Sequence, residues 1–188
     1  MTSNFTPTPP DLASFNNAAF VRGRPKVVEG LWHLLQAMLL SSWLPGSFHR
    51  RMLLRVFGAS IGTGVVIKPG VRVKFPWKLK VGNHSWIGEH VWIDNLAPVT
   101  IGANCCLSQG AYLCTGSHDW SRRHFDLIVK PIRLEDGAWV AAKACVGPGV
   151  TVGQGAILAM GSVAVTDLAP WQIYQGNKAV HLKSRVIQ

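Results

Sequence analysis

The chain has 188 residues, 48% of them hydrophobic, which fits one domain with a continuous apolar core and excludes a largely disordered protein. Its formal net charge of +10 favours polyanionic partners, such as a phosphorylated cofactor or an anionic membrane face. The basic residues are scattered and belong to no nucleic-acid-binding motif, so we expect no nucleic acid partner.

Residues 1–57 predict an irregular arm followed by a helical cap. The first 26 residues are rich in Pro, Thr, Ser and Asn, and we expect them to be ordered only against a neighbour. Apolar residues at helical spacing from Val27 to Leu39, and an amphipathic segment from Ser47 to Phe57, predict two helices. Because repeat stacks need capping, these helices are expected to cover the open end of a stack. The alternative is peripheral attachment to a membrane, aided by Arg50, Arg51 and Arg55.

Residues 58–166 carry aliphatic side chains at an interval of six, which fits neither a helix nor an ordinary strand. Three hexads make one triangular coil, so the repeat predicts an all-β parallel β-helix with the aliphatics inside. These residues are Ile61, Ile67, Val73, Val81, Ile87, Ile93, Ile101, Leu107, Leu113, Leu134, Val140, Val146, Val152 and Leu158. A glycine often follows the aliphatic and is expected to permit the tight corner, as at Gly62, Gly82, Gly88, Gly102, Gly147 and Gly153.

The frame is disturbed at three places, where a groove can open. It slips by two residues at Leu79–Lys80 and again at Val99–Thr100, which lengthens a corner of the coil. Over residues 119–133 the period is lost, and we expect a loop ejected from the wall, where binding residues commonly lie. Residues 167–188 form a closing segment after the last hexad.

His118 is the strongest candidate for chemistry. It lies in the segment TGSHDW, between the third run of hexads and the ejected loop, so it should project from a corner of the coil. An imidazole can take a proton from a hydroxyl near neutral pH, which is the task of a general base.

Three longer segments resemble a known family of enzymes. The resumed hexads AWVAAKACVGPGVTVGQGAILAMGSV and the closing YQGNKAV resemble the galactoside and maltose O-acetyltransferases of the hexapeptide-repeat group. The segment IDNLAPVTIGANCCLSQGAYLCTGSHDW resembles the candidate colanic acid biosynthesis acetyltransferases of that group, and the match spans roughly residues 56–182. The resemblance implies a left-handed β-helix, a homotrimer with active sites between subunits, and acetyl-CoA lying along the helix wall.

By the same resemblance, His118 is the general base that activates a carbohydrate hydroxyl. Asp94 and Asn95, in a long corner, are expected to orient the sugar, although ordinary turn chemistry explains them equally well. Asp119 is a weaker candidate for orienting the imidazole, because adjacent residues of an extended chain point in opposite directions.

The resemblance also implies a set of donor contacts. The pantetheine arm is expected near Trp139, Ala142, Met160 and Gly161. Where the family often has a Thr-Lys pair, Thr166 is followed here by Asp167, and Lys178 replaces the proline of the closing segment. Thr166, Lys178 and Lys183 are therefore the candidate phosphate ligands.

The resulting hypothesis is an acetyltransferase that moves an acetyl group from acetyl-CoA to a sugar hydroxyl in exopolysaccharide or capsule biosynthesis. One alternative is a non-catalytic repeat scaffold, and another is an amine or small-molecule acceptor. A zinc site formed by His84, His90 and His118 across subunits is disfavoured by their spacing, and no metal is expected. The cysteine usage and the absence of a signal-peptide pattern predict a cytoplasmic location, with the inner membrane face as the alternative.

Overall fold

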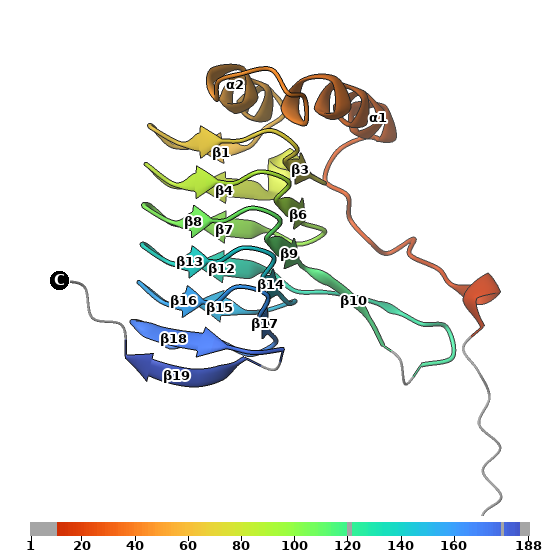
Figure 1. The fold of residues 1–188 in the computed structure, drawn as a ribbon. Coiled ribbons are helices and arrows are strands. Elements are labelled where there is room, and N and C mark those ends of the chain that lie inside the picture. The colour runs from red at the N-terminus through yellow and green to blue at the C-terminus, as the bar shows by residue number, and fades with distance from the viewer. Residues whose placement is uncertain (1–10, 120–121, 178, 185–188) are drawn as a thin grey trace, which may run out of the picture.

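The computed structural model describes residues 11–119, 122–177 and 179–184, with residues 182–184 described by their backbone alone. Its body is a parallel β-helix whose short strands stack into three walls (Figure 1). Wall A contains β1 (Ser60–Ile61), β4 (Leu79–Val81), β7 (Val99–Ile101), β12 (Ile132–Leu134) and β15 (Thr151–Val152). Wall B contains β2 (Val66–Ile67), β5 (Trp86–Ile87), β8 (Cys106–Leu107), β13 (Trp139–Val140), β16 (Ile157–Leu158), β18 (Gln172–Gln175) and the antiparallel β19 (Val180–Ser184). Wall C contains β3 (Arg72–Val73), β6 (Trp92–Asp94), β9 (Tyr112–Cys114), β14 (Cys145–Val146) and β17 (Val163–Ala164).

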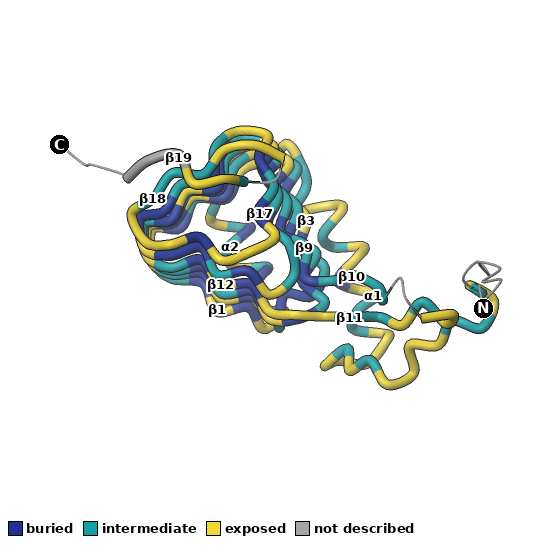
Figure 2. Tube along the Cα trace, turned by 90° about the horizontal axis from the view of Figure 1, so that it is seen from below, coloured by how far each residue is buried: buried dark blue, intermediate teal, exposed yellow. Residues whose placement is uncertain are grey.

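The aliphatic side chains at the interval of six form the inward column of the β-helix, which confirms the prediction. On wall B, Ile67, Ile87, Leu107, Val140 and Leu158 lie in register on successive strands, and each is at most 1% exposed. The corresponding aliphatics of walls A and C are also buried, so dark blue segments recur along every wall in Figure 2. Burial of each such side chain stabilises the fold by about 1.5–3 kcal/mol, which makes this column the main source of stability.

The glycine after the aliphatic has a different role from the one expected. Backbone φ is positive two residues further on, at corner positions such as Gly64, His84 and Asn104, and not at Gly82. A Cβ added to Gly82 would lie 2.5 Å from the carbonyl carbon of Gly102 on the next coil. The expectation of a conformational role was therefore wrong, because close stacking of one corner on the next excludes a side chain there.

Two helices cover the first coil, as the cap prediction requires. They are α1 (Lys26–Leu35), continued by the π-helical η2 (Gln36–Leu40), and α2 (Phe48–Val56) (Figure 1). The Trp32 side chain is fully buried, donates to the Val73 carbonyl at 2.8 Å and packs against the Phe57 ring. Within the described residues, no helix has the length and apolar character needed to cross a bilayer.

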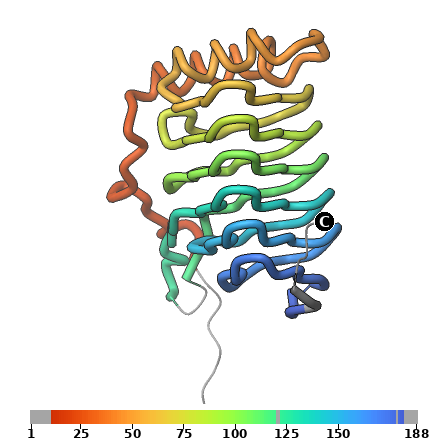
Figure 3. Tube along the Cα trace, turned by 90° about the vertical axis from the view of Figure 1, so that its left-hand side faces the viewer, coloured from red at the N-terminus to blue at the C-terminus, as the bar shows by residue number. Residues whose placement is uncertain are grey.

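The described part of the N-terminal arm, residues 11–25, contacts its own chain, while residues 1–10 of the expected arm lie outside the described residues. After the short η1 (Leu12–Ser14), it passes along the outside of the coils between the ejected hairpin and the cap (Figure 3). Its beginning is fastened to the hairpin, since the Asp11 N–H donates to the Arg123 carbonyl at 2.8 Å. Its other end is fastened to η3 (Pro76–Lys78), where the Trp77 indole donates to the Arg22 carbonyl at 2.7 Å.

The interruption is a β-hairpin. Strands β10 (Gly116–His118) and β11 (Leu127–Val129) pair antiparallel and project from the corner where wall C passes into wall A (Figure 1). The excursion thus begins at Gly116, and the coil resumes at Ile132, which differs by a few residues at its start from the expected 119–133. Thr115, fully buried, anchors its base, because the hydroxyl donates to the Asp94 carbonyl and accepts from the Ala97 N–H.

Candidate active site

Both frame slips lie at the corner from which the hairpin projects. The first slip directly follows η3, and the second directly follows the segment Leu96–Pro98, one coil further along. The lengthened corners leave two adjoining cavities, of about 510 and 240 Å³, between the coil, the hairpin and the arm. The prediction that a groove opens at the slips is therefore confirmed.

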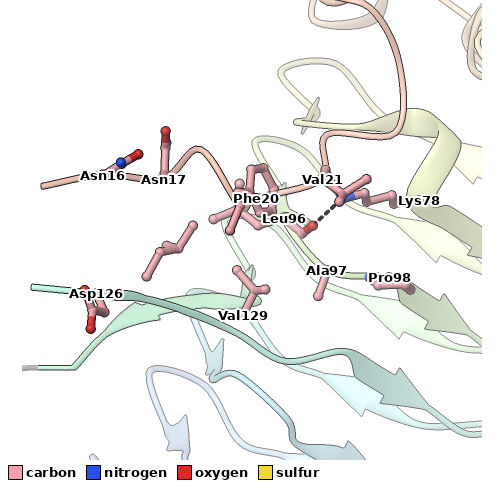
Figure 4. Close-up of a pocket in the computed structure, with 12 residues that line it drawn as sticks. Asn16, Asn17, Phe20, Val21, Lys78, Leu96, Ala97, Pro98, Asp126 and Val129 are labelled. Carbon is pink, nitrogen blue, oxygen red and sulfur yellow. Dashed lines mark hydrogen bonds between the residues drawn. The ribbon is translucent and has the colours of Figure 1, made fainter.

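Side chains from all three segments line these cavities. The larger cavity is bounded by Asn17 and Phe20 of the arm, Leu96 of the corner and Leu127 of the hairpin, and these four residues also line the smaller one. Figure 4 shows Phe20 and Val21 on the arm facing Val129 of the hairpin and Ala97 of the corner. The lining thus combines aromatic and aliphatic surface with a few amide and charged groups, as is usual for a small-molecule site.

Lys78 connects the arm to the corner beside the larger cavity. Its ammonium donates to the Val21 carbonyl at 2.8 Å and to the Leu96 carbonyl at 2.7 Å (Figure 4). The same nitrogen lies 4.7 Å from the centroid of the Phe20 ring. Burial lowers the pKa of Lys78 from its ordinary value. These contacts fix the arm as one wall of the cavity.

His118 lines the smaller cavity from the end of β10. Its Nδ1 lies 2.7 Å from the Phe125 carbonyl oxygen, and its ring stacks on the Phe125 ring with centroids 4.2 Å apart. The Phe15 ring of the arm packs against it edge-on at 5.5 Å. A carbonyl oxygen only accepts hydrogen bonds, so Nδ1 must carry the proton, and Nε2 of the neutral ring keeps its lone pair.

Phe125 holds the imidazole with both its backbone and its side chain. It has a φ of +51° in the turn of the hairpin, in the left-handed region that aromatic residues seldom occupy. Backbone strain of this kind costs about 1–2 kcal/mol and persists where the surrounding structure imposes it. Here the unusual φ accompanies an arrangement in which the carbonyl and the ring of one residue both contact His118.

Asp94 is half-buried beside the smaller cavity rather than free. Its Oδ1 lies 3.3 Å from the Lys74 ammonium, and its Oδ2 accepts a long hydrogen bond of 3.4 Å from the Tyr112 hydroxyl. Burial, with Cys114 and Asp94 nearby, raises the pKa of Tyr112, so the phenol stays protonated and donates. Lys74 is the member of this group that lines the cavity.

Asn95 and Asp119 both make contacts within the chain. Asn95 is fully buried, and its amide group binds both the N–H and the carbonyl of Phe75, so it has the turn role. Contact with a sugar would require these two bonds to open. Asp119 forms an ion pair with Arg122 at 3.8 Å, and the group that orients the His118 imidazole is the Phe125 carbonyl. A role of Asp119 in orienting the ring therefore stays a prediction.

The candidate pantetheine contacts lie away from His118. Ala142 and Gly161 occupy the corner between walls B and C on successive coils, where the Gly161 N–H donates to the Ala142 carbonyl at 3.0 Å. Met160, next to Gly161, is 73% exposed. Trp139 projects from wall B and donates to the Ser108 hydroxyl at 2.9 Å. Within one chain Ala142, Met160 and Gly161 thus lie on a different corner of the coil from His118, while Trp139 lies on wall B.

The candidate phosphate ligands are only partly described. Thr166 is exposed near the end of the last coil, and the neighbouring Asp167 accepts from the Thr151 N–H at 2.7 Å. Lys178 lies outside the described residues. Lys183 is described by its backbone alone, which pairs with Ile173 in the hairpin of β18 and β19.

The histidines of the zinc alternative do not converge within the chain. His84 and His90 are exposed corner residues with φ of 58° and 57°, and each lies on a different corner from His118. In the part of the chain that the structure describes, no group of three His, Cys, Asp or Glu side chains could hold a metal ion.

The sequence did not identify several residues of the site. Phe15, Phe20, Lys74 and Lys78 belong to segments without a repeating pattern, and only the loop context pointed to Phe125. The clearest available signal was the pair of frame slips, because the corners they lengthen border the cavities.

Comparisons with known proteins agree with this architecture. The chain is 39% identical over 178 residues to WcaF of Escherichia coli (strain K12), a candidate colanic acid biosynthesis acetyltransferase, covering 94% of this chain and 97% of that protein. The hexapeptide-repeat-containing acetyltransferase VCA0836 of Vibrio cholerae O1 biovar eltor, solved in complex with acetyl coenzyme A, superposes with a TM-score of 0.78 at 25% identity, covering 86% and 89% of the two chains. A maltose O-acetyltransferase from Clostridium difficile 630 shares the fold, with a TM-score of 0.73 at 19% identity and coverage of 87% and 90%. No family model matches the chain.

Proposed function

Because the chain belongs to the hexapeptide-repeat acetyltransferases and uses acetyl-CoA as its donor, we propose that it acetylates a hydroxyl of a carbohydrate acceptor. The relative assigned to colanic acid biosynthesis supports a role in exopolysaccharide or capsule formation. The observation that carries the proposal is the hydrogen bond from His118 Nδ1 to the Phe125 carbonyl, which leaves Nε2 as a base beside a cavity. Family membership favours this enzyme over the scaffold alternative.

His118 acts in the proposed reaction as the general base. Nε2 takes the proton of the acceptor hydroxyl while the hydroxyl oxygen attacks the thioester carbonyl carbon of acetyl-CoA. The tetrahedral intermediate collapses with cleavage of the carbon–sulfur bond, and the imidazolium returns the proton to the leaving thiolate. The products are an acetyl ester and free CoA, and no covalent acyl-enzyme is formed. Throughout the cycle the Phe125 carbonyl accepts from Nδ1 and stabilises the imidazolium.

The cavities at the hairpin corner are the proposed acceptor site. Their aromatic and aliphatic lining suits the apolar faces of a sugar ring, while Asn17, Arg22 and Asp126 supply donors and acceptors for hydroxyls. Both cavities share the Phe20 ring, so an acceptor that extends from His118 into the larger cavity would pass along it. Asp94 acts in this scheme by holding Lys74, which lines the smaller cavity.

We also propose a homotrimer, because within one chain the acceptor half of the site and the donor half lie on different corners of the coil. His118 lies on the corner between walls C and A, whereas Ala142 and Gly161 lie on the corner between walls B and C. In a trimer the hairpin corner of one subunit can face the donor-binding corner of the next, with Trp139 near the pantetheine. Thr166, Lys178 and Lys183 remain the candidate ligands of the CoA phosphates.

We expect sedimentation equilibrium to give a solution mass of three chains of 20.5 kDa each. The mass should stay constant on dilution through the concentration range used for activity assays. A mass of one chain in a preparation that turns over would contradict the shared site.

We expect Phe20→Ala to raise KM for the acceptor several-fold, because the variant loses the aromatic surface common to both cavities. The measurement is CoA thiol release with acetyl-CoA and a panel of sugars, polysaccharide repeat units and amines. With the parent protein, a sugar without an amine should support release. KM of the variant for acetyl-CoA should be unchanged. The matched control is Phe48→Ala, which removes a 70% exposed ring on the cap. Release with amines alone would overturn the proposal of a hydroxyl acceptor.

A further inference from the structure

The cap carries two rows of exposed apolar side chains on the sides of its helices opposite to their buried faces. On α1 and η2, Val27, Leu31, Leu34 and Met38 are 50–82% exposed and recur at helical spacing on one face. On α2, Phe48, Met52 and Val56 form a second exposed row, four residues apart. Since both helices use their opposite sides to cover the first coil, the two rows share the end surface of the molecule (Figure 1). We call this surface the cap face.

A buried arginine shapes the loop that extends the cap face. Arg50 is 1% exposed, and its guanidinium donates to the carbonyls of Leu40, Ser42, Leu44 and Gly46. Burial of a cation is costly unless hydrogen bonds compensate it, so this loop is firmly held. The loop presents Trp43 at 73% and Leu44 at 53% exposure. The structure thus holds two large apolar side chains in water instead of folding them inward.

The charge around the cap face is strongly positive. Besides the buried Arg50, residues 24–57 contain four Lys or Arg and a single acid, Glu29, which pairs with Arg22 of the arm. Arg24 and Lys26 are exposed at the start of α1, where the helix dipole favours acids, so helix stability does not explain them. Arg51 and Arg55 bind carbonyls of the first coil, and among the described residues no carboxylate neutralises either of them.

We propose that the cap face binds the surface of an anionic lipid bilayer. An apolar helical face with tryptophan at its edge and cations around it is typical of segments that lie in the membrane interface. The apolar rows would enter the interface between headgroups and acyl chains, and the cations would contact the lipid phosphates. Attachment at this end would leave the hairpin and the cavities beside the membrane, exposed to water.

The test is co-sedimentation of the full chain with vesicles of phosphatidylcholine, with and without phosphatidylglycerol. We expect binding to the anionic vesicles that weakens at high salt, and at least tenfold weaker binding to the neutral vesicles. Leu34→Glu with Met38→Glu should weaken binding to the anionic vesicles at least tenfold. The matched control is Val165→Glu with Val180→Glu, which adds the same two charges at positions that are 61% and 62% exposed at the far end of the stack and should bind like the parent.

A second pair of variants separates charge from folding. Arg24→Gln and Lys26→Gln remove exposed charges from the start of α1, and each should weaken binding to anionic vesicles about fivefold. Circular dichroism and thiol release with a soluble acceptor check that every variant is folded. Equal binding by the parent and the Leu34→Glu/Met38→Glu variant would overturn the proposal. So would a parent that ignores anionic vesicles but has a larger solution mass than this variant, because the cap face would then join copies of the chain.

Discussion

Replacement of His118 with alanine is expected to lower kcat by about two to four orders of magnitude, the usual contribution of a general base. The imidazole is the group at the smaller cavity whose tautomer the structure defines, through the 2.7 Å contact of Nδ1 with the Phe125 carbonyl. Alanine leaves no atom that can accept the hydroxyl proton. The measurement is the steady-state rate of CoA thiol release with a saturating sugar acceptor.

Two controls make this result specific for the base. Binding of acetyl-CoA to the variant, measured by calorimetry, should match that of the parent, because the candidate donor contacts lie on another corner. His33→Ala removes an imidazole that is half exposed on α1 and should leave turnover unchanged. If the His118 variant retained more than about a tenth of the parent kcat, base catalysis by this residue would be excluded.

Ile87→Asp should unfold the protein. The Ile87 side chain is fully buried between Ile67 and Leu107 on wall B, in an interior made of aliphatic side chains. A carboxylate there has no partner, and its desolvation costs several kcal/mol in addition to the lost apolar burial of about 1.5–3 kcal/mol. The sum approaches the whole stability of an ordinary domain, about 5–15 kcal/mol.

Circular dichroism at increasing urea concentration measures this effect. The expected outcome is loss of the β signal without denaturant, or a midpoint far below that of the parent. Ile87→Leu keeps the site apolar at nearly the same volume and should cost less than about 1.5 kcal/mol. An Ile87→Asp variant as stable as the Ile87→Leu control would contradict the assignment of this column as the core.

The sequence predicts the fold because the same pattern of inward aliphatic side chains repeats in every coil. Each coil places the same positions inside, so the interval of six identified Ile67, Ile87 and Leu107 without knowledge of any contact. The two frame slips were readable for the same reason, as departures from a regular pattern. The role of Gly82 was not readable in this way, because a glycine required by close stacking and one required by a positive φ look alike in a sequence.

The sequence predicts only part of the candidate site, because the site depends on contacts between distant segments that have no repeating pattern. The Phe15 ring packs against His118 although about a hundred residues of chain separate them. Lys78 binds the Val21 carbonyl across 57 residues of chain. Asn95 was assigned two roles of equal merit, and only its two bonds to Phe75 decided between them. The sequence predicts His118 as the base, but it does not indicate the group that contacts its Nδ1, because that group is a backbone carbonyl, which every residue possesses.

The most direct test of the account is a crystal structure of the protein with CoA and a carbohydrate acceptor bound. We predict a sugar hydroxyl within hydrogen-bonding distance of His118 Nε2, the sugar ring against Phe20, and the CoA sulfur approaching the same hydroxyl from a neighbouring subunit. An acceptor bound away from the hairpin corner, or an imidazole whose Nε2 points away from the acceptor, would contradict the account.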